Sequence, residues 1–105
     1  MELLKWYGIR TVYEIADRAR GRERLYEERI VLIEAASQDE AIAEAEREAS
    51  AYAVDGIRYL GYAMSFEMFD PPAHGVEVFS LMRDSRLESR RYLDKFFDTG
   101  RERSS

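Results

Sequence analysis

The sequence predicts an α+β domain in which an antiparallel four-stranded sheet carries a helix on one face. Two observations predict the sheet, because apolar and polar residues alternate from Lys5 to Ala16 and again from Leu60 to Met68, the period of a strand with one buried face. A third observation predicts the helix, since an alanine- and glutamate-rich segment follows Ser37. The expected order is β-β-α-β-β-α, with the C-terminal helix on the sheet or at a dimer interface.

The first two strands are expected to form a hairpin. Residues 17–24 separate them and hold a central glycine and many charges, which is typical of a loop. The return strand spans residues 25–36, and its centre, Ile30 to Ile33, is apolar on both faces. Such a strand usually lies in the interior of a sheet covered on both sides, so we expect that position here.

The helix is expected to begin sharply after Ser37. Ser37 and Glu40 match the capping box, in which the serine hydroxyl accepts from the backbone N–H of the glutamate and the glutamate carboxylate can reach back. Asp39 and Glu40 also suit the positive end of the helix dipole. Apolar residues then follow at helical spacing, and Asp55-Gly56 ends the helix.

The second half of the chain is expected to hold two more strands and a helix. Residues 70–75 contain two prolines and therefore form a loop, after which Val76 to Met82 is predicted to be the fourth strand. We expect residues 1–83 to form the core α+β domain, residues 84–98 the C-terminal helix of the same domain, and residues 99–105 a frayed tail.

The composition indicates one globular domain. The chain has 105 residues, of which 46% are hydrophobic, enough for one modest core. It has no cysteine, which excludes disulfides, thiolate metal sites and a cysteine nucleophile and fits a reducing compartment. Neither a signal peptide nor the roughly 20 apolar residues of a membrane span can be recognised. We therefore expect a cytoplasmic protein without membrane contact.

The charge is unevenly distributed. Residues 37–82 hold two basic and nine acidic side chains, whereas residues 83–105 hold seven basic and five acidic ones. An acidic middle argues against general affinity for nucleic acid, because the phosphate backbone repels a negative surface.

Four segments carry a resemblance to a known family. They are Trp6-Tyr7, Tyr26-Glu27-Glu28-Arg29-Ile30-Val31-Leu32-Ile33-Glu34-Ala35, Asp39-Glu40-Ala41 and Gly75-Val76-Glu77-Val78-Phe79. With these segments, residues 6–80 resemble a small, mostly bacterial family classified as a domain of unknown function. The resemblance implies an α+β domain in a bacterial setting and implies no activity, cofactor or catalytic residue.

Few residues suggest catalysis. The single histidine, His74, lies in the proline-containing loop and could pair with Asp70, but no nucleophile in a recognisable setting accompanies it. An exposed loop histidine is the simpler interpretation. One histidine without cysteine cannot form a typical zinc site, and the glycines form no phosphate-binding loop. No catalytic residue, metal or cofactor is predicted.

Two sets of residues are candidate binding sites. Arg10, Glu28 and Glu77 fall on neighbouring predicted strands and could line a small polar pocket or form a structural ion pair. The second set alternates through the hairpin loop, where it could bind phosphates or the carboxylates of a partner or remain a solvated loop. It consists of Arg18, Arg20, Arg22 and Arg24.

The favoured hypothesis is a non-enzymatic binding or interaction protein, such as a bacterial accessory or immunity-type protein, because an acidic surface can meet a basic partner. Two alternatives stay open. One is a small-molecule-binding or catalytic homodimer with a polar pocket, and the other is nucleic-acid binding through the arginine-rich hairpin. A homodimer is expected because the second apolar face of the sheet needs the C-terminal helix or another subunit to cover it.

Overall fold

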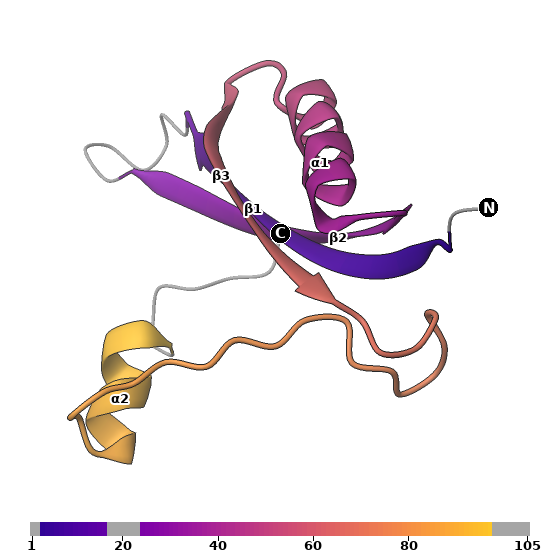
Figure 1. Ribbon diagram of the computed structural model, residues 1–105. Helices are drawn as coiled ribbons and strands as arrows, with labels where there is room; N and C mark the ends of the chain where they lie inside the picture. Colours follow the sequence, from indigo (N-terminus) through magenta and orange to yellow (C-terminus); the bar gives the residue numbers. More distant parts are fainter. Residues whose placement is uncertain (1–2, 17–23, 98–105) are drawn as a thin grey trace.

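A computed structural model describes residues 3–16 and 24–97 of the chain (Figure 1). It contains a sheet, a long helix against that sheet and a short helix near the end of the chain. The α+β class is therefore confirmed. The elements, in chain order, are β1 (Lys5–Ile15), β2 (Leu25–Ala35), α1 (Gln38–Tyr52), β3 (Ile57–Glu67) and α2 (Ser89–Phe96).

The first strand is the central strand of the sheet. The strand order is β2-β1-β3, and both neighbours run antiparallel to β1. The register with β2 is unbroken from Lys5 opposite Ala35 to Ile15 opposite Leu25, so the first two strands pair as predicted. The register with β3 contains one irregularity, and Gly61 lies there with a φ of 75°, a conformation that glycine adopts readily.

The prediction of a four-stranded sheet is wrong. The sheet has three strands, and the element order is β-β-α-β-α because residues 76–82 form no strand. We call these residues the crossing segment. It runs past the sheet on the side opposite α1 (Figure 1), and Phe79 packs against Phe66 of β3 with the ring centroids 6.3 Å apart. Phe79, which the alternation assigned to a strand, therefore lies against the surface of the sheet instead of pairing at its edge.

A glycine allows this crossing. The backbone carbonyl of Val78 lies directly over Gly8 of β1, and an added Cβ at Gly8 would overlap the carbonyl oxygen. Any side chain at this position would lift the crossing segment away from the sheet, because backbone atoms cannot yield as a flexible side chain can. Gly8 therefore fixes where the chain crosses β1.

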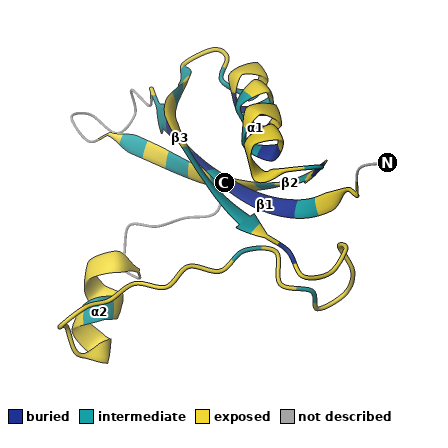
Figure 2. Ribbon diagram, in the orientation of Figure 1, coloured by how far each residue is buried: buried dark blue, intermediate teal, exposed yellow. Residues whose placement is uncertain are grey.

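One face of the sheet, the inner face, is covered by α1. Tyr7, Ile9, Thr11 and Tyr13 of β1 are buried there, and Figure 2 shows the buried band along β1 beneath the helix. On the helix, Ala41, Ala45 and Ala49 are fully buried. Their small side chains recur every fourth residue and let the helix axis approach the strands closely.

The start of α1 is confirmed at the predicted residue. Ser37 is the N-cap, and its hydroxyl oxygen accepts a hydrogen bond of 3.2 Å from the backbone N–H of Glu40. Asp39 and Glu40 occupy the first turn, where their charge favours the helix dipole. The turn after the helix contains Asp55 and Gly56, both with positive φ.

The opposite face of the sheet, which we call the outer face, is apolar but only partly covered. The prediction that β2 lies in the interior of the sheet is wrong, because β2 is an edge strand. Its outer-face residues Ile30 and Leu32 remain 46% and 39% exposed. Val31 and Ile33 pack on the core beneath α1, whereas Ile30 and Leu32 lie on the outer face, where no second layer covers them. The apolar side chains of the outer face are Trp6, Val12, Tyr26, Ile30, Leu32, Leu60, Tyr62, Met64 and Phe66.

The chain after the crossing segment forms an arm, residues 83–97, that includes α2. The arm stands away from the sheet and α1 (Figure 1). The radius of gyration is 16.2 Å, whereas a compact domain of this length has about 13 Å. The C-terminal helix is thus not packed on the sheet of its own chain.

Candidate functional site

An ion pair lies in the middle of the outer face. Arg10 Nη1 of β1 is 3.4 Å from Glu28 Oε1 of β2, so the sequence correctly placed these two side chains side by side. The Arg10 guanidinium also lies 5.5 Å from the centre of the Phe79 ring, in the range of a cation–π contact. Its Nε is buried without a hydrogen-bond partner. Arg10 therefore holds the crossing segment against the sheet.

The third residue of the predicted polar pocket does not join this pair. Glu77 is exposed, and among the described residues it forms no ion pair with Arg10. Strand pairing brought Arg10 and Glu28 together, but Glu77 belongs to a segment that does not pair. A binding role for Arg10, Glu28 and Glu77 remains a prediction.

Of the four predicted binding arginines, only Arg24 lies within the described residues. Its Nη1 is 3.3 Å from Glu14 Oε2, and Arg58 Nη2 is 2.6 Å from Glu14 Oε1. The hydrogen bond from Arg58, together with the charge of both arginines, lowers the pKa of Glu14 below its usual value. Arg24 thus has a carboxylate partner in its own chain. The other three, Arg18, Arg20 and Arg22, lie outside the described residues, so their binding role stays a prediction.

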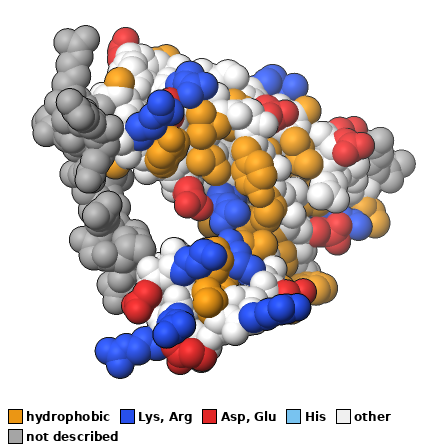
Figure 3. All heavy atoms as spheres, turned by 90° about the vertical axis from the view of Figure 1, so that its left-hand side faces the viewer, with side chains coloured by type: hydrophobic (Ala, Val, Ile, Leu, Met, Phe, Trp, Pro, Cys, Tyr) orange, Lys and Arg blue, Asp and Glu red, His pale blue; other side chains and the backbone are white. Residues whose placement is uncertain are grey.

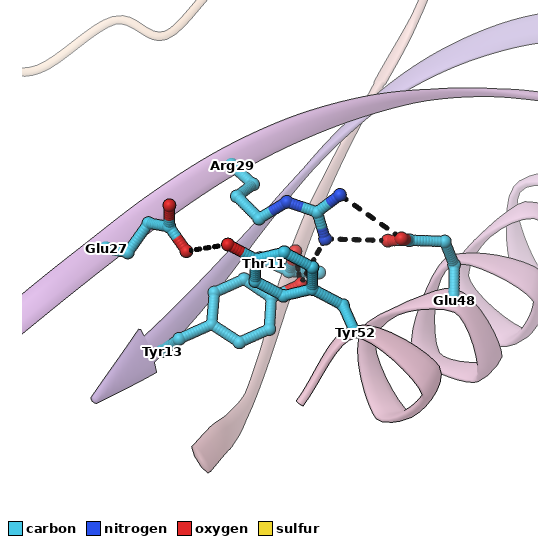
Figure 4. A network of polar contacts seen from close by, with 6 residues as sticks. All are labelled: Thr11, Tyr13, Glu27, Arg29, Glu48 and Tyr52. Atoms are coloured by element: carbon cyan, nitrogen blue, oxygen red, sulfur yellow. Dashed lines mark hydrogen bonds and ion pairs between the residues drawn. The ribbon is translucent and has the colours of Figure 1, made fainter. Parts of the chain in front are cut away.

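The inner face holds a polar network that connects the sheet to α1 (Figure 4). Arg29 of β2 donates to both carboxylate oxygens of Glu48 at 2.9 and 3.2 Å and to the hydroxyl of Tyr13 at 3.2 Å. The Tyr13 hydroxyl is also 2.6 Å from the hydroxyl of Thr11. Burial lowers the pKa of Arg29, but the hydrogen bonds to Glu48 and Tyr13 outweigh it and the pKa is raised. The arginine is therefore a fixed cation with satisfied partners.

Two tyrosines extend the network to further carboxylates. The Tyr52 hydroxyl donates to Glu27 at 2.6 Å, and the Tyr59 hydroxyl donates to Glu46 at 2.7 Å. The bond to Glu27 raises the pKa of Tyr52. Burial, followed by the bond to Glu46, raises the pKa of Tyr59. Both phenols are thus held as neutral donors.

These contacts reduce the number of α1 carboxylates that are free to bind a partner. Of its five carboxylates, Glu46 and Glu48 bind groups of the sheet, and Glu44 forms an ion pair with Arg47. Only Asp39 and Glu40 have no such partner among the described residues. The charge count of α1 therefore overstates the negative surface offered to a basic partner.

Other features of the described residues offer little chemistry. Residues 3–16 and 24–97 contain no group of three or more histidine, aspartate or glutamate side chains that could hold a metal ion. His74 is exposed in its loop, as expected. A groove of about 720 Å³ lies between the start of α1 and the ends of β1 and β2, with Trp6, Leu32, Glu34 and Glu40 among its lining residues.

The arm is organised by its own contacts. Arg83 donates to the Tyr92 hydroxyl at 3.0 Å, and its guanidinium lies 4.4 Å from the centre of the Phe96 ring. Tyr92 and Phe96 stack with their centroids 4.8 Å apart. Leu93 and Phe97 nevertheless remain 52% and 50% exposed. The arm thus presents aromatic, aliphatic and arginine side chains that are not packed on the sheet or on α1 within residues 3–16 and 24–97.

Part of the first half of the chain matches a protein-family model. Residues 6–56 match the family model described as Domain of unknown function (DUF4288). The predicted resemblance to a family of unknown function is thereby confirmed for this DUF4288 segment, which contains β1, β2 and α1. The crossing segment and the arm lie beyond the match. No curated protein and no solved structure is detectably similar to the chain.

Neither α1 nor α2, the helices within the described residues, is long and apolar enough to cross a bilayer.

Sequence reasoning missed the central role of Arg29. The sequence did contain a signal for this role. Every second residue of β2 lies on one face, and Glu27 and Arg29 share that face with the apolar Leu25, Val31 and Ile33. Two charges on an otherwise apolar face need partners. Those partners are Tyr52 and Glu48 of α1. The helical pattern alone did not show which carboxylates of α1 would face the sheet.

Proposed function

We propose that the protein is a non-enzymatic interaction module that binds a protein partner through its outer face and its arm. The observation that carries this proposal is the part of the apolar outer face that the crossing segment leaves exposed, where Ile30, Leu32 and Tyr62 are 46%, 39% and 44% exposed. Contiguous exposed apolar surface on a small protein is typical of an interaction site.

The side chains of the arm support the same function. Aromatic residues and arginine are enriched in the buried centres of interfaces, and the arm presents Phe96, Phe97 and Arg83 together. In a cytoplasmic setting, to which the absence of cysteine is suited, such a module would act as a bacterial accessory or immunity-type protein. Catalysis has less support, because Arg29 and Glu48 already satisfy one another.

The proposal is tested by photo-crosslinking in cells that express the full chain. A photoreactive phenylalanine analogue replaces Tyr62 on the outer face or, as the matched control, Val54 in the turn after α1, which is 55% exposed. We expect a covalent protein adduct from position 62 and none from position 54. No adduct from position 62, or equal adducts from both positions, would overturn the proposal.

A further inference from the structure

The arm contains a helix, α2, that is not packed on the sheet or on α1 within the described residues. α2 has eight residues, and none of them is buried. Isolated helices shorter than about 12 residues are marginal in water, so α2 requires an apolar surface for its stability. Leu93, Phe96 and Phe97 are the side chains available for that contact, at 52%, 36% and 50% exposed.

The outer face is a surface of the matching kind. It presents partly exposed aliphatic and aromatic side chains on both edge strands, namely Ile30 and Leu32 of β2 and Leu60 and Tyr62 of β3. In Figure 3, hydrophobic side chains form a band above a hollow, and basic side chains lie below that hollow. The outer face is an apolar surface without a helix on it, and α2 is a helix whose apolar side chains lack such a surface.

The charges of the two parts are opposite. Within the described residues, the body (residues 3–16 and 24–82) has six basic and thirteen acidic side chains, a net charge of −7. The arm has five basic and three acidic ones, a net charge of +2. On the outer face itself, Glu28 is 62% exposed at its side chain and Glu34 is exposed. The arginines of a docked arm would meet these carboxylates at the rim of the contact.

The root of the arm is fixed while its helix is free. Phe79 is held by Arg10 and Phe66, and the Val78 carbonyl lies on Gly8, so the chain leaves the outer face from a defined point. Beyond it, Arg83 joins Tyr92 and Phe96 into one small unit. The unit extends away from its own sheet (Figure 1).

We propose that two copies of this chain exchange arms, so that α2 of each copy packs on the outer face of the other. This inference rests on the proposed function and names the partner of the same surface. One chain carries both halves of the contact, and a two-fold symmetric exchange satisfies both at once and closes the assembly. A different protein would need two complementary surfaces, one that binds the outer face and one that binds α2.

The exchange is tested first by cross-linking, which the absence of cysteine in the chain makes free of background. Leu93→Cys and Ile30→Cys are prepared as single variants with tags of different mass, mixed, and treated with a flexible bismaleimide, since a disulfide would demand stricter geometry. The control mixture pairs Leu93→Cys with Val54→Cys. We expect a mixed covalent dimer from positions 93 and 30 and none from positions 93 and 54.

The double variant Leu93→Cys/Ile30→Cys separates exchange from folding back. Exchange predicts a covalent dimer at low protein concentration. A cross-linked species of single-chain mass would show that α2 packs on its own sheet and would overturn the proposal, as would equal cross-linking to position 54.

The second test is the mass in solution, measured by analytical ultracentrifugation. We expect the natural chain to sediment as a dimer, at twice 12.3 kDa. The Phe96→Asp variant should sediment as a monomer, and its far-ultraviolet circular dichroism signal from the sheet should be unchanged. The Val54→Asp control should remain a dimer. A dimer that survives Phe96→Asp would overturn arm exchange. A monomeric natural chain that still forms an adduct with another protein at position 62 would overturn the second copy as partner and leave the proposed function standing. A monomer without adducts would overturn both.

Discussion

The guanidinium carbon of Arg29 lies 3.6 Å from the centre of the Tyr52 ring, while both of its terminal nitrogens donate to Glu48. Tyr52 and Glu48 are one turn apart on α1, so a single side chain of β2 fastens the last turns of the helix to the sheet. Both components are partly shielded from water, with 24% and 36% of the Arg29 and Glu48 side chains exposed, and shielding strengthens ionic and cation–π contacts.

Replacing Arg29 with Met should lower the free energy of unfolding by about 2 kcal/mol, because it removes both charge-assisted hydrogen bonds to Glu48 and leaves that carboxylate without its donor. Urea denaturation measures the effect. The matched control is Arg47→Met, which removes an ion pair between neighbouring residues of α1 whose side chains are 69% and 54% exposed. Such a pair contributes less than about 1 kcal/mol. Equal losses in the two variants would contradict the role assigned to Arg29.

Replacing Ser37 with Ala should cost about 1 kcal/mol of folding stability, since the hydroxyl accepts a hydrogen bond from the Glu40 N–H, one of the free N–H groups in the first turn of α1. Thermal and urea denaturation provide the measurement. Ser50→Ala is the control, because Ser50 is exposed in the last turns of the same helix and alanine has the higher helix propensity. We expect Ser50→Ala to be neutral or slightly stabilising, and a loss as large as that of Ser37→Ala would refute the capping argument.

Replacing Gly8 with Ala should release the crossing segment, because the new methyl group would occupy the position of the Val78 carbonyl. The expected loss of stability is about 1–3 kcal/mol, as for other overpacked sites. Nuclear magnetic resonance would show shifts at Phe79 and Phe66, which lose their contact. Val78→Ala keeps the carbonyl and trims a side chain that is 38% exposed, so it should leave those resonances nearly unchanged.

Replacing Tyr59 with Phe should change the alkaline stability of the protein. The pKa of Tyr59 is raised above its usual value of 10.0 by burial and by the bond to Glu46. Its stabilising effect is therefore fully present below pH 10 and declines as the pH rises from there through the folded-state pKa. We expect Tyr59→Phe to be less stable than the natural chain by about 1 kcal/mol at pH 8.

This difference should shrink above pH 10. Urea denaturation at a series of pH values tests the trend, with Tyr62→Phe as the control, since the Tyr62 hydroxyl makes no hydrogen bond among the described residues. A constant difference between Tyr59→Phe and the natural chain across the alkaline range would show that the Tyr59 proton is not linked to folding.

Local patterns predicted the local structure well. The Ser37 cap set the first residue of α1, and the alternation after Lys5 identified β1 because side chains of a strand must point to alternate faces. Pairing of the first two strands then placed Arg10 beside Glu28. Each of these inferences depends on neighbours in sequence or on one short connection.

Longer-range relations could not be read in this way. The apolar alternation of Val76 to Met82 is the same whether the segment joins a sheet edge or lies across its surface. It lies across the surface here, where the missing side chain of Gly8 leaves room for the Val78 carbonyl. Likewise, the apolar centre of β2 indicates two faces to be covered but does not say by what. Edge position and uncovered surface followed from the place of β3 on the other side of β1.

The boundary of the DUF4288 match has a consequence for the integrity of the sheet. The match ends at residue 56 and β3 begins at Ile57, yet β1 is hydrogen-bonded to β3 along most of its length. A polypeptide trimmed to the matched range would lack β3. Its β1 would then be an edge strand with unpaired backbone groups, which can pair with other polypeptide chains. The smallest piece of this chain able to persist alone therefore reaches at least to Glu67.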